Sequence, residues 1–303
     1  MTTKIFAALA APLALMALSP ALGETPAAAS AHSDSKAMGH ISIEQAGSGP
    51  AVILIPGLSS PRAVYDGIVP ELARTHTVYT VQVNGFAGED PAQNLQPGIL
   101  DGTVEDLHRF IADNALKAPR VIGHSMGGLL GLMLARAHPE DVGALMVVDA
   151  LPYVGDIFVP GATVAQVEPQ AKAMRDAMAG AYGKPADTAT AAAIAASQAL
   201  KPESRTTVAG YIAQADPRVA AQAMYEDMTT DLRPAMAAIE TPVTLVYPWS
   251  AAMPQERADA FYRAEYAGAP HVAFVPVADS GHFVMLDQPQ AFAAAVEAFL
   301  AAK

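Results

Sequence analysis

A serine between glycines and a histidine late in the chain have the best setting for covalent chemistry. Gly123-His124-Ser125-Met126-Gly127 follows an apolar run and precedes a helical pattern that continues to about Ala137. A tight strand-to-helix turn of this kind holds its central serine in a strained conformation with the hydroxyl exposed, and the flanking glycines let the turn close. The helix that follows favours developing negative charge. The pattern predicts Ser125 as a nucleophile. The alternative is a glycine-lined turn with an incidental serine.

A serine hydroxyl attacks efficiently only when a base accepts its proton. His282 lies in Ser280-Gly281-His282-Phe283, between the last predicted strand and the final helix. A nucleophile followed much later by its histidine is the chain order that such a turn accompanies. We therefore expect His282 to be the general base, with a capping or solvent-exposed histidine as the alternative. The other histidines have less suitable settings: His32 and His40 in or beside the N-terminal leader, His76, His108 and His138 on surface loops or helices, His124 with its side chain on the wrong side of its strand, and His271 at a strand start.

Predicted strands alternate with predicted helices, which is typical of a parallel sheet covered on both faces. The predicted strands are 41–44, 51–55, 77–83, the run before the serine turn, 144–148, 243–247 and 272–275. Predicted helices end near Ala73, span 255–267 and 289–302, and include one with Thr103 and Asp106 as its N-terminal cap.

Between residues 151 and 238 the alternation stops, and the sequence is rich in alanine and methionine with several helical stretches. We interpret this segment as a helical insertion in one α/β domain. Four methionines fall at helical spacings within it: Met174, Met178, Met224 and Met228. They predict either a forgiving apolar pocket or simple packing between helices.

The first 23 residues have the pattern of a bacterial signal peptide. A short basic start is followed by an apolar run from Ile5 to about Leu18, and Ala21-Leu22-Gly23 supplies small residues for cleavage. The alternative is a membrane anchor, but the run contains Pro12 and is short for a bilayer span. We expect a signal peptide over 1–23, a flexible leader over 24–38, and a periplasmic or secreted protein without stable membrane insertion.

Composition excludes several kinds of chemistry. The 303 residues include no cysteine, so disulfides, thiolate metal sites and cysteine nucleophiles are excluded. The formal charge is −12, without a basic run, so we expect no nucleic-acid partner. Oligomeric state does not follow from the sequence.

Three segments together resemble the α/β-hydrolase superfamily, in its branch of capped serine esterases: Gly-His-Ser-Met-Gly-Gly at 123–128, Pro-Gly-Leu at 56–58, and Ser-Gly-His-Phe-Val-Met-Leu-Asp-Gln-Pro at 280–289. The resemblance implies a mostly parallel sheet of the eight-stranded type with helices on both faces. The core would be residues 39–150 and 239–303, and the cap, 151–238, would follow the sixth strand. It also implies an oxyanion hole from the backbone N–H groups of Leu58 and Met126, although Pro56 replaces the usual histidine.

The acidic partner of the histidine departs from the superfamily's common pattern. Pro248-Trp249-Ser250-Ala251-Ala252 follows the seventh strand without a carboxylate, and Glu256 lies within a predicted helix. Asp149 ends the strand after the nucleophile helix, the position that some relatives use, so we expect it to orient the imidazole. The alternatives are a structural role for Asp149, an acid at Asp227 or Asp231, and a dyad without an acid.

These residues predict carboxylic ester hydrolysis in two acyl-transfer steps, without a metal or organic cofactor. The expected partner is a small ester with an apolar portion. Hydrolysis of a lactone or of a carbon–carbon bond would use the same residues. A ligand-binding protein without catalysis is a further alternative, because the carboxylate after the seventh strand is missing.

Overall fold

The computed structural model describes residues 35–302. The predicted signal peptide, 1–23, and residues 24–34 of the predicted leader lie outside this range. Within the rest of that leader, Lys36–Ala37 form a short strand, β1, that pairs with Ser42 and Ile43. The sheet therefore begins before the predicted core boundary at residue 39. No helix in 35–302 has both the length and the apolar character that a membrane span requires.

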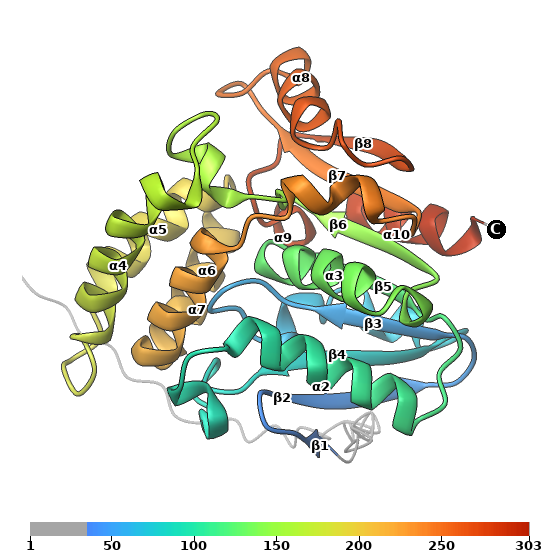
Figure 1. The fold of residues 1–303 in the computed structure, drawn as a ribbon, viewed down its shortest axis with the longest axis horizontal. Helices are drawn as coiled ribbons and strands as arrows, with labels where there is room; N and C mark the ends of the chain where they lie inside the picture. Colours follow the sequence, from blue (N-terminus) through green and yellow to red (C-terminus); the bar gives the residue numbers. More distant parts are fainter. Residues whose placement is uncertain (1–34, 303) are drawn as a thin grey trace, which may run out of the picture. The chain divides into compact units, whose positions relative to one another are not determined.

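Eight strands form one sheet in the order β1-β2-β4-β3-β5-β6-β7-β8 (Figure 1). The strands β3 to β8 are mutually parallel, whereas β1 and β2 run antiparallel to their neighbours. This arrangement confirms the predicted mostly parallel sheet. The bounds beyond β1 are β2 Ile41–Gly47, β3 Ala51–Ile55, β4 Thr77–Val83, β5 Arg120–His124, β6 Ala144–Val148, β7 Val243–Trp249 and β8 Val272–Ala278.

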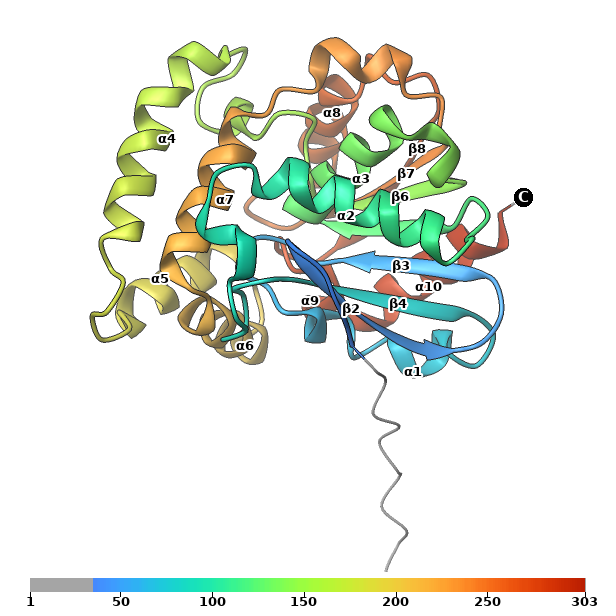
Figure 2. The ribbon, with the colours of Figure 1, turned by 60° about the horizontal axis from the view of Figure 1, so that its bottom comes forward.

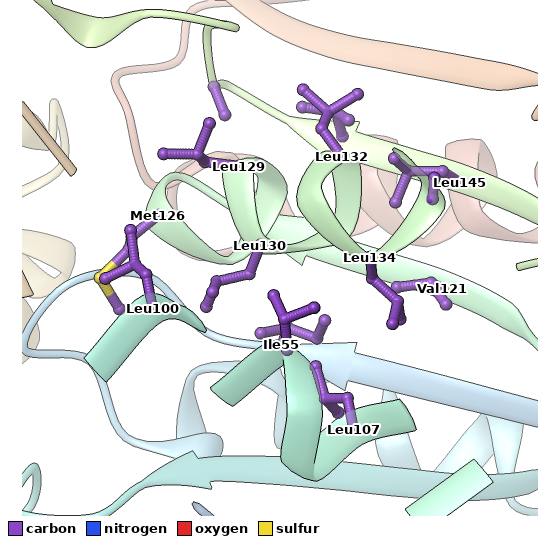
Figure 3. Packing of buried hydrophobic residues seen from close by; sticks show 14 of the residues in the cluster. Ile55, Leu100, Leu107, Val121, Met126, Leu129, Leu130, Leu132, Leu134 and Leu145 are labelled. Atoms are coloured by element: carbon purple, nitrogen blue, oxygen red, sulfur yellow. The ribbon is translucent and has the colours of Figure 1, made fainter. Parts of the chain in front are cut away.

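The buried strands divide their side chains between two apolar layers, because successive side chains point to opposite faces. In β3, Ile53 and Ile55 face one layer, and Val52 and Leu54 face the other. Helices α2 and α3 cover the first face, where Leu107 and Leu130 pack beside Ile55 (Figure 3). Helix α10 covers the other face. The helices outside the cap are α1 Val69–Leu72, α2 Ile99–Asp113, α3 Met126–Ala137, α8 Gln255–Glu265, α9 Val284–Asp287 and α10 Pro289–Ala301.

Four helices lie between β6 and β7 in the sequence, as the predicted helical insertion requires: α4 Val164–Ala179, α5 Thr188–Gln198, α6 Pro202–Gln214 and α7 Pro217–Thr229. We call these four helices, together with the loops that join them, the cap. They gather beyond the ends of the parallel strands, on the same side in both views (Figures 1 and 2). Met224 and Met228 are buried between α7 and α4, with Met174 and Met178 packed against them. These methionines are thus core of the cap. The division at residues 151 and 238 stays a prediction.

The predicted helix start at Thr103 is wrong. Helix α2 begins four residues earlier, at Ile99, and both Thr103 and Asp106 are buried inside it. A residue of a distant helix caps the N-terminus of α2 instead. The carboxylate of Glu226 on α7 accepts hydrogen bonds from the backbone N–H groups of Gly98 and Leu100, at 2.7 and 2.9 Å. A local pattern could not reveal a capping group 126 residues away.

Asp287, at the end of α9, ties the cap to the loop that carries His282. Its buried carboxylate accepts hydrogen bonds from the N–H groups of Gly281 at 2.8 Å, Leu200 at 2.8 Å and Lys201 at 3.1 Å. Burial alone would raise the pKa of Asp287, but these hydrogen bonds outweigh it and hold the pKa below its usual value. The ionised form is therefore part of the fold.

Asp287→Ala should lower the free energy of unfolding by about 3 kcal/mol, because three N–H groups lose their charged acceptor. The melting temperature should then fall by roughly 6–12 °C, measured by circular dichroism at pH 7. Because the folded-state pKa is depressed, this stabilisation is present above pH 3.8 and is lost as the pH falls through the folded pKa, so wild type and variant should converge in acid. Glu297→Ala, on the exposed side of α10, is the control. Equal melting temperatures for wild type and Asp287→Ala would contradict the prediction.

Candidate active site

Ser125 occupies a strained turn between β5 and α3. Its backbone angles are φ 54° and ψ −125°, which residues other than glycine rarely adopt. A Cβ at Gly123 would lie 2.1 Å from the carbonyl oxygen of Gly127, and a Cβ at Gly127 would lie 2.2 Å from that of Ile55. Only glycine fits at these two positions. The turn has the geometry that the sequence predicts for an exposed nucleophile.

His282 and Asp149 meet across a long separation in the sequence. The Nδ1 of His282 donates a hydrogen bond of 2.7 Å to Oδ2 of Asp149. Asp149 directly follows β6 and has a positive φ of 47°, a second strained backbone position at this edge of the sheet. Because Nδ1 carries the proton, Nε2 of the neutral imidazole is free to accept one. This is the arrangement that the sequence predicts for a histidine base and its acidic partner.

Tyr262 completes the environment of Asp149, a contact that was not expected from the sequence. Its hydroxyl donates a hydrogen bond to Oδ1 of Asp149, while His282 holds Oδ2. Burial raises the pKa of Tyr262 well above its usual value, and the charge of Asp149 adds to this effect, so the phenol stays a donor. Tyr262 lies 113 residues from Asp149, on α8, and its local sequence carries no sign of this contact.

The pKa of Asp149 lies below its usual value. Burial alone would raise it, but the charge of His282 and the hydrogen bonds from His282 and Tyr262 together outweigh burial. An ionised carboxylate fixes the tautomer of the imidazole and stabilises it when it becomes protonated. The electrostatics therefore suit a base at His282.

The other predicted acids do not contact His282. Asp231 is bound by Arg233, with a shortest contact of 2.7 Å. Glu256 lies exposed in the first turn of α8. Asp227 lines the same cavity as His282 but makes no hydrogen bond to it among the contacts in residues 35–302. Of the sequence alternatives, the structure brings Asp149 alone into hydrogen-bonding contact with the imidazole.

The prediction that the side chain of His124 lies on the wrong side of its strand is incorrect, because this side chain contacts His282. Its Nε2 donates a hydrogen bond of 3.0 Å to the backbone oxygen of His282, and the two rings lie 4.5 Å apart between centroids. Burial lowers the pKa of His124 to about 3, with the charge of His282 as a second cause. The side chain thus faces the site as a neutral donor. The short segment before Ser125 forms the turn and also positions the loop around His282.

The two predicted oxyanion donors lie near the serine. Met126 is the first residue of α3, and its N–H has no backbone acceptor in the described part of the chain. The same is true of the N–H of Leu58. Gly57, next to Leu58, packs closely on the serine, because a Cβ there would lie 2.9 Å from Cβ of Ser125. These donors are free, and their role toward an oxyanion stays a prediction.

Ser125, Asp149 and His282 all line one cavity of about 760 Å³. Most of its wall is apolar, including Met126, Leu129, Leu151, Trp249 and Phe261. The cap supplies Ser197, Leu200 and Asp227. The hydroxyl of Ser125 makes no hydrogen bond to another residue in 35–302, so its contact with Nε2 of His282 stays a prediction. Such contacts often tighten only when substrate binds.

One group of side chains in the described range has the composition of a metal site. His108, His138 and Asp141 offer ligand atoms that lie within 4.8 Å of one another. His108 lies on α2, and His138 and Asp141 follow the end of α3 remote from Ser125; none of them lines the cavity. His108 already bonds Asp141 at 2.7 Å, and the two imidazoles stack 3.8 Å apart and nearly parallel, so their in-plane lone pairs do not converge. The cavity around Ser125 has no comparable group of His, Asp and Glu ligands in the described residues.

Comparison with known proteins agrees with this architecture. The family model described as the alpha/beta hydrolase family matches residues 52–295. A pimeloyl-(acyl-carrier protein) methyl ester esterase of Aeromonas hydrophila is 32% identical over 112 residues, 37% of this chain and 42% of that protein. The corresponding esterase of Nitrosomonas europaea is 31% identical over 116 residues, 38% of this chain and 43% of that protein. The chain thus matches less than half the length of these relatives.

Solved structures share the fold at low sequence identity. A thermophilic esterase from Thermogutta terrifontis has a TM-score of 0.70 and 19% identity, over 86% of this chain and 92% of that one. An enol-lactonase from Burkholderia xenovorans has a TM-score of 0.70 and 16% identity, over 86% and 96%. These similarities establish the fold, and the family model covers most of the sequence. The chain therefore belongs to the α/β-hydrolase family.

Proposed function

We propose that the protein is a serine hydrolase that cleaves carboxylic esters. The proposal depends on one observation: the strained Ser125 shares a cavity with a histidine whose Nδ1 is held by the ionised Asp149. A fold alone does not decide the reaction, because one fold supports many activities. The esterase names of the relatives and of a structural neighbour give additional support.

The first half-reaction forms an acyl-enzyme. Oγ of Ser125 attacks the ester carbonyl, and Nε2 of His282 accepts the hydroxyl proton. The N–H groups of Leu58 and Met126 stabilise the oxyanion that forms. His282 then gives its proton to the departing alkoxide, and the alcohol leaves with the acyl group bonded to Ser125.

The second half-reaction releases the acid. A water molecule gives its proton to His282 and attacks the acyl carbonyl, and Ser125 leaves with the proton returned by His282. Asp149 stabilises the imidazolium in both halves. Every group that moves a proton belongs to the protein, so the mechanism requires no metal or organic cofactor.

The cavity supports an ester with an apolar portion. Its wall is mostly aliphatic and aromatic, and Ile157 at its edge is 61% exposed. Phe158 and Val159, which follow Ile157, are 51% and 53% exposed. Apolar side chains left in water around a cavity are typical of a ligand-binding entrance.

Ser125→Ala should abolish hydrolysis of a short chromogenic ester, because no other residue would supply the nucleophile. It should also abolish covalent labelling by a fluorophosphonate, measured by intact-protein mass spectrometry. Ser197→Ala removes another hydroxyl of the cavity and should still be labelled. Labelling of Ser125→Ala, or no turnover and no labelling of the wild type, would refute the proposal. The second result would favour a binding protein that retains the fold.

Asp149→Asn should lower kcat by about 10⁴-fold, because the amide favours the wrong tautomer of His282. Tyr262→Phe leaves the carboxylate but frees one of its oxygens, so kcat should fall by roughly tenfold, the value of one hydrogen bond to a charged group. KM should change little in both variants. Tyr225→Phe, which removes a hydroxyl that bonds Glu168 in the cap, is the control. If Asp149→Asn costs less than tenfold, another residue holds the imidazole.

The assignment of the base to His282 requires His124 to stay neutral. Ring ¹⁵N shifts of His124 should not change between pH 5 and 9 and should report a proton on Nε2, because burial lowers its pKa to about 3. The unfolded chain binds a proton here near pH 6.5 and the folded chain does not, so stability should fall as the pH drops from 6.5 toward 3. Titration of His124 near pH 6.5 would contradict this assignment.

A further inference from the structure

Asp227 is a carboxyl group in the cavity without a partner in the protein. It lies on α7, which buries Ala223 and Met224 on its core side. Asp227 lines the cavity with Ser125 and His282, and its carboxyl makes no hydrogen bond or ion pair with any other residue in 35–302. This distinguishes it from the other two acids of the cavity: Asp149 is held by His282 and Tyr262, and Asp156 is held by Arg233 at 2.7 Å.

The side chain of Asp227 is partly buried, and a polar group with reduced access to water and no protein partner does not recover within the protein the hydrogen bonds that it loses. Burial raises the pKa of Asp227 to about 7, even though the charge of His282 acts in the opposite direction. The remaining charged groups around the cavity are Asp149, Asp156 and Arg257. Arg257 is exposed and forms no ion pair with Asp227 among the described residues. Near neutral pH the carboxyl is therefore available both as a donor and as an acceptor of hydrogen bonds.

Two other roles for Asp227 do not fit its position. It does not orient the base, because Asp149 already holds Nδ1 of His282. It does not stabilise the cap through a contact of its own, because the carboxyl has no partner within the described chain. What its position does provide is a carboxyl group without a protein partner in the same cavity as Ser125, whose wall is mostly apolar. Such isolated polar groups fix the orientation and the identity of a ligand.

We propose that Asp227 recognises the substrate: its carboxyl hydrogen-bonds a hydroxyl group that the ester carries near the scissile bond. This inference rests on the proposed function of Ser125. The hydroxyl could belong to a hydroxy acid on the acyl side or to a diol or polyol on the alcohol side. Both present the same chemistry to the carboxyl. A substrate carboxylate would be repelled by the acids of the cavity. A cationic group would itself favour the ionised form of Asp227, so a cationic ester is a separate outcome of the test.

Matched esters test the proposal. Hydrolysis of three esters would be followed by pH-stat at pH 7. Ethyl butanoate has no hydroxyl group, ethyl 3-hydroxybutanoate has one on the acyl side, and 2-hydroxyethyl butanoate has one on the alcohol side. The wild type should show at least a tenfold higher kcat/KM for one hydroxylated ester than for ethyl butanoate. A site built to bond a hydroxyl strongly rejects the analogue that lacks it.

Asp227→Leu keeps the approximate size of the side chain but removes both hydrogen-bonding functions, so the ratio of kcat/KM values should fall to about one. Asp227→Asn keeps a donor and an acceptor and should retain most of the preference. This rescue separates recognition from a merely structural role. Asp176→Leu and Asp176→Asn, at an exposed position of the cap outside the cavity, are the matched controls and should keep the wild-type ratio.

Each other outcome overturns the inference. An unchanged ratio in Asp227→Leu, or a wild type without preference, shows that Asp227 does not recognise a hydroxyl. A preference for butyrylcholine that disappears in both Asp227 variants shows a cation site instead. Fluorophosphonate labelling of Ser125 in every variant separates failure of the recognition role of Asp227 from failure of the proposed hydrolase function. If labelling and ethyl butanoate hydrolysis persist while the ratio stays fixed, recognition alone fails. If the wild type shows neither, the proposed function fails and the inference with it.

Discussion

The hydrogen bond between Asp149 and His282 is the interaction on which the site depends. It joins groups 133 residues apart and requires β6 and β8 to lie in the same sheet with β7 between them. Because parallel strands present their carboxyl ends at one edge, the sheet delivers Ser125, Asp149 and the loop of His282 to that edge together. The two layers of apolar side chains hold the strands in this register. Packing thus fixes the geometry of the polar groups.

The strain at this edge has a clear origin. Ser125 and Asp149 both adopt positive φ angles at the point where a parallel strand ends and the chain turns away. Such conformations cost about 1–3 kcal/mol each and persist only where the surrounding structure determines them. Here Ser125 N bonds Val148 O at 3.0 Å and Asp149 N bonds Val246 O at 2.8 Å, so the ladder of the sheet continues one residue into each turn. The sheet therefore supplies the constraint that displays both side chains.

The sequence predicted the parts of the site that leave a local pattern. The glycines around Ser125 mark a turn that excludes side chains, and the apolar runs mark the strands, so the fold, the strained serine turn and the contact of Asp149 with His282 could be predicted. The roles of three other residues could not be predicted, because each of them contacts a residue far away in the chain: Tyr262, Glu226 and His124. A tyrosine on an amphipathic helix looks the same whether its hydroxyl meets water or a buried carboxylate. The failed helix start at Thr103 has the same cause.

Asp287 has a consequence for protein engineering. The cap meets the rest of the molecule at a carboxylate that also holds Gly281, one residue before His282. A cap transplanted from another member of the family would have to present two backbone amides at the positions of Leu200 and Lys201. It would also have to place a carboxylate where Glu226 accepts hydrogen bonds from the N-terminus of α2. A graft that misplaces the junction at Asp287 would disturb the imidazole loop even if every residue of the cavity were kept. Exchange of caps between members of this family is thus limited by a few hydrogen bonds between the cap and the core.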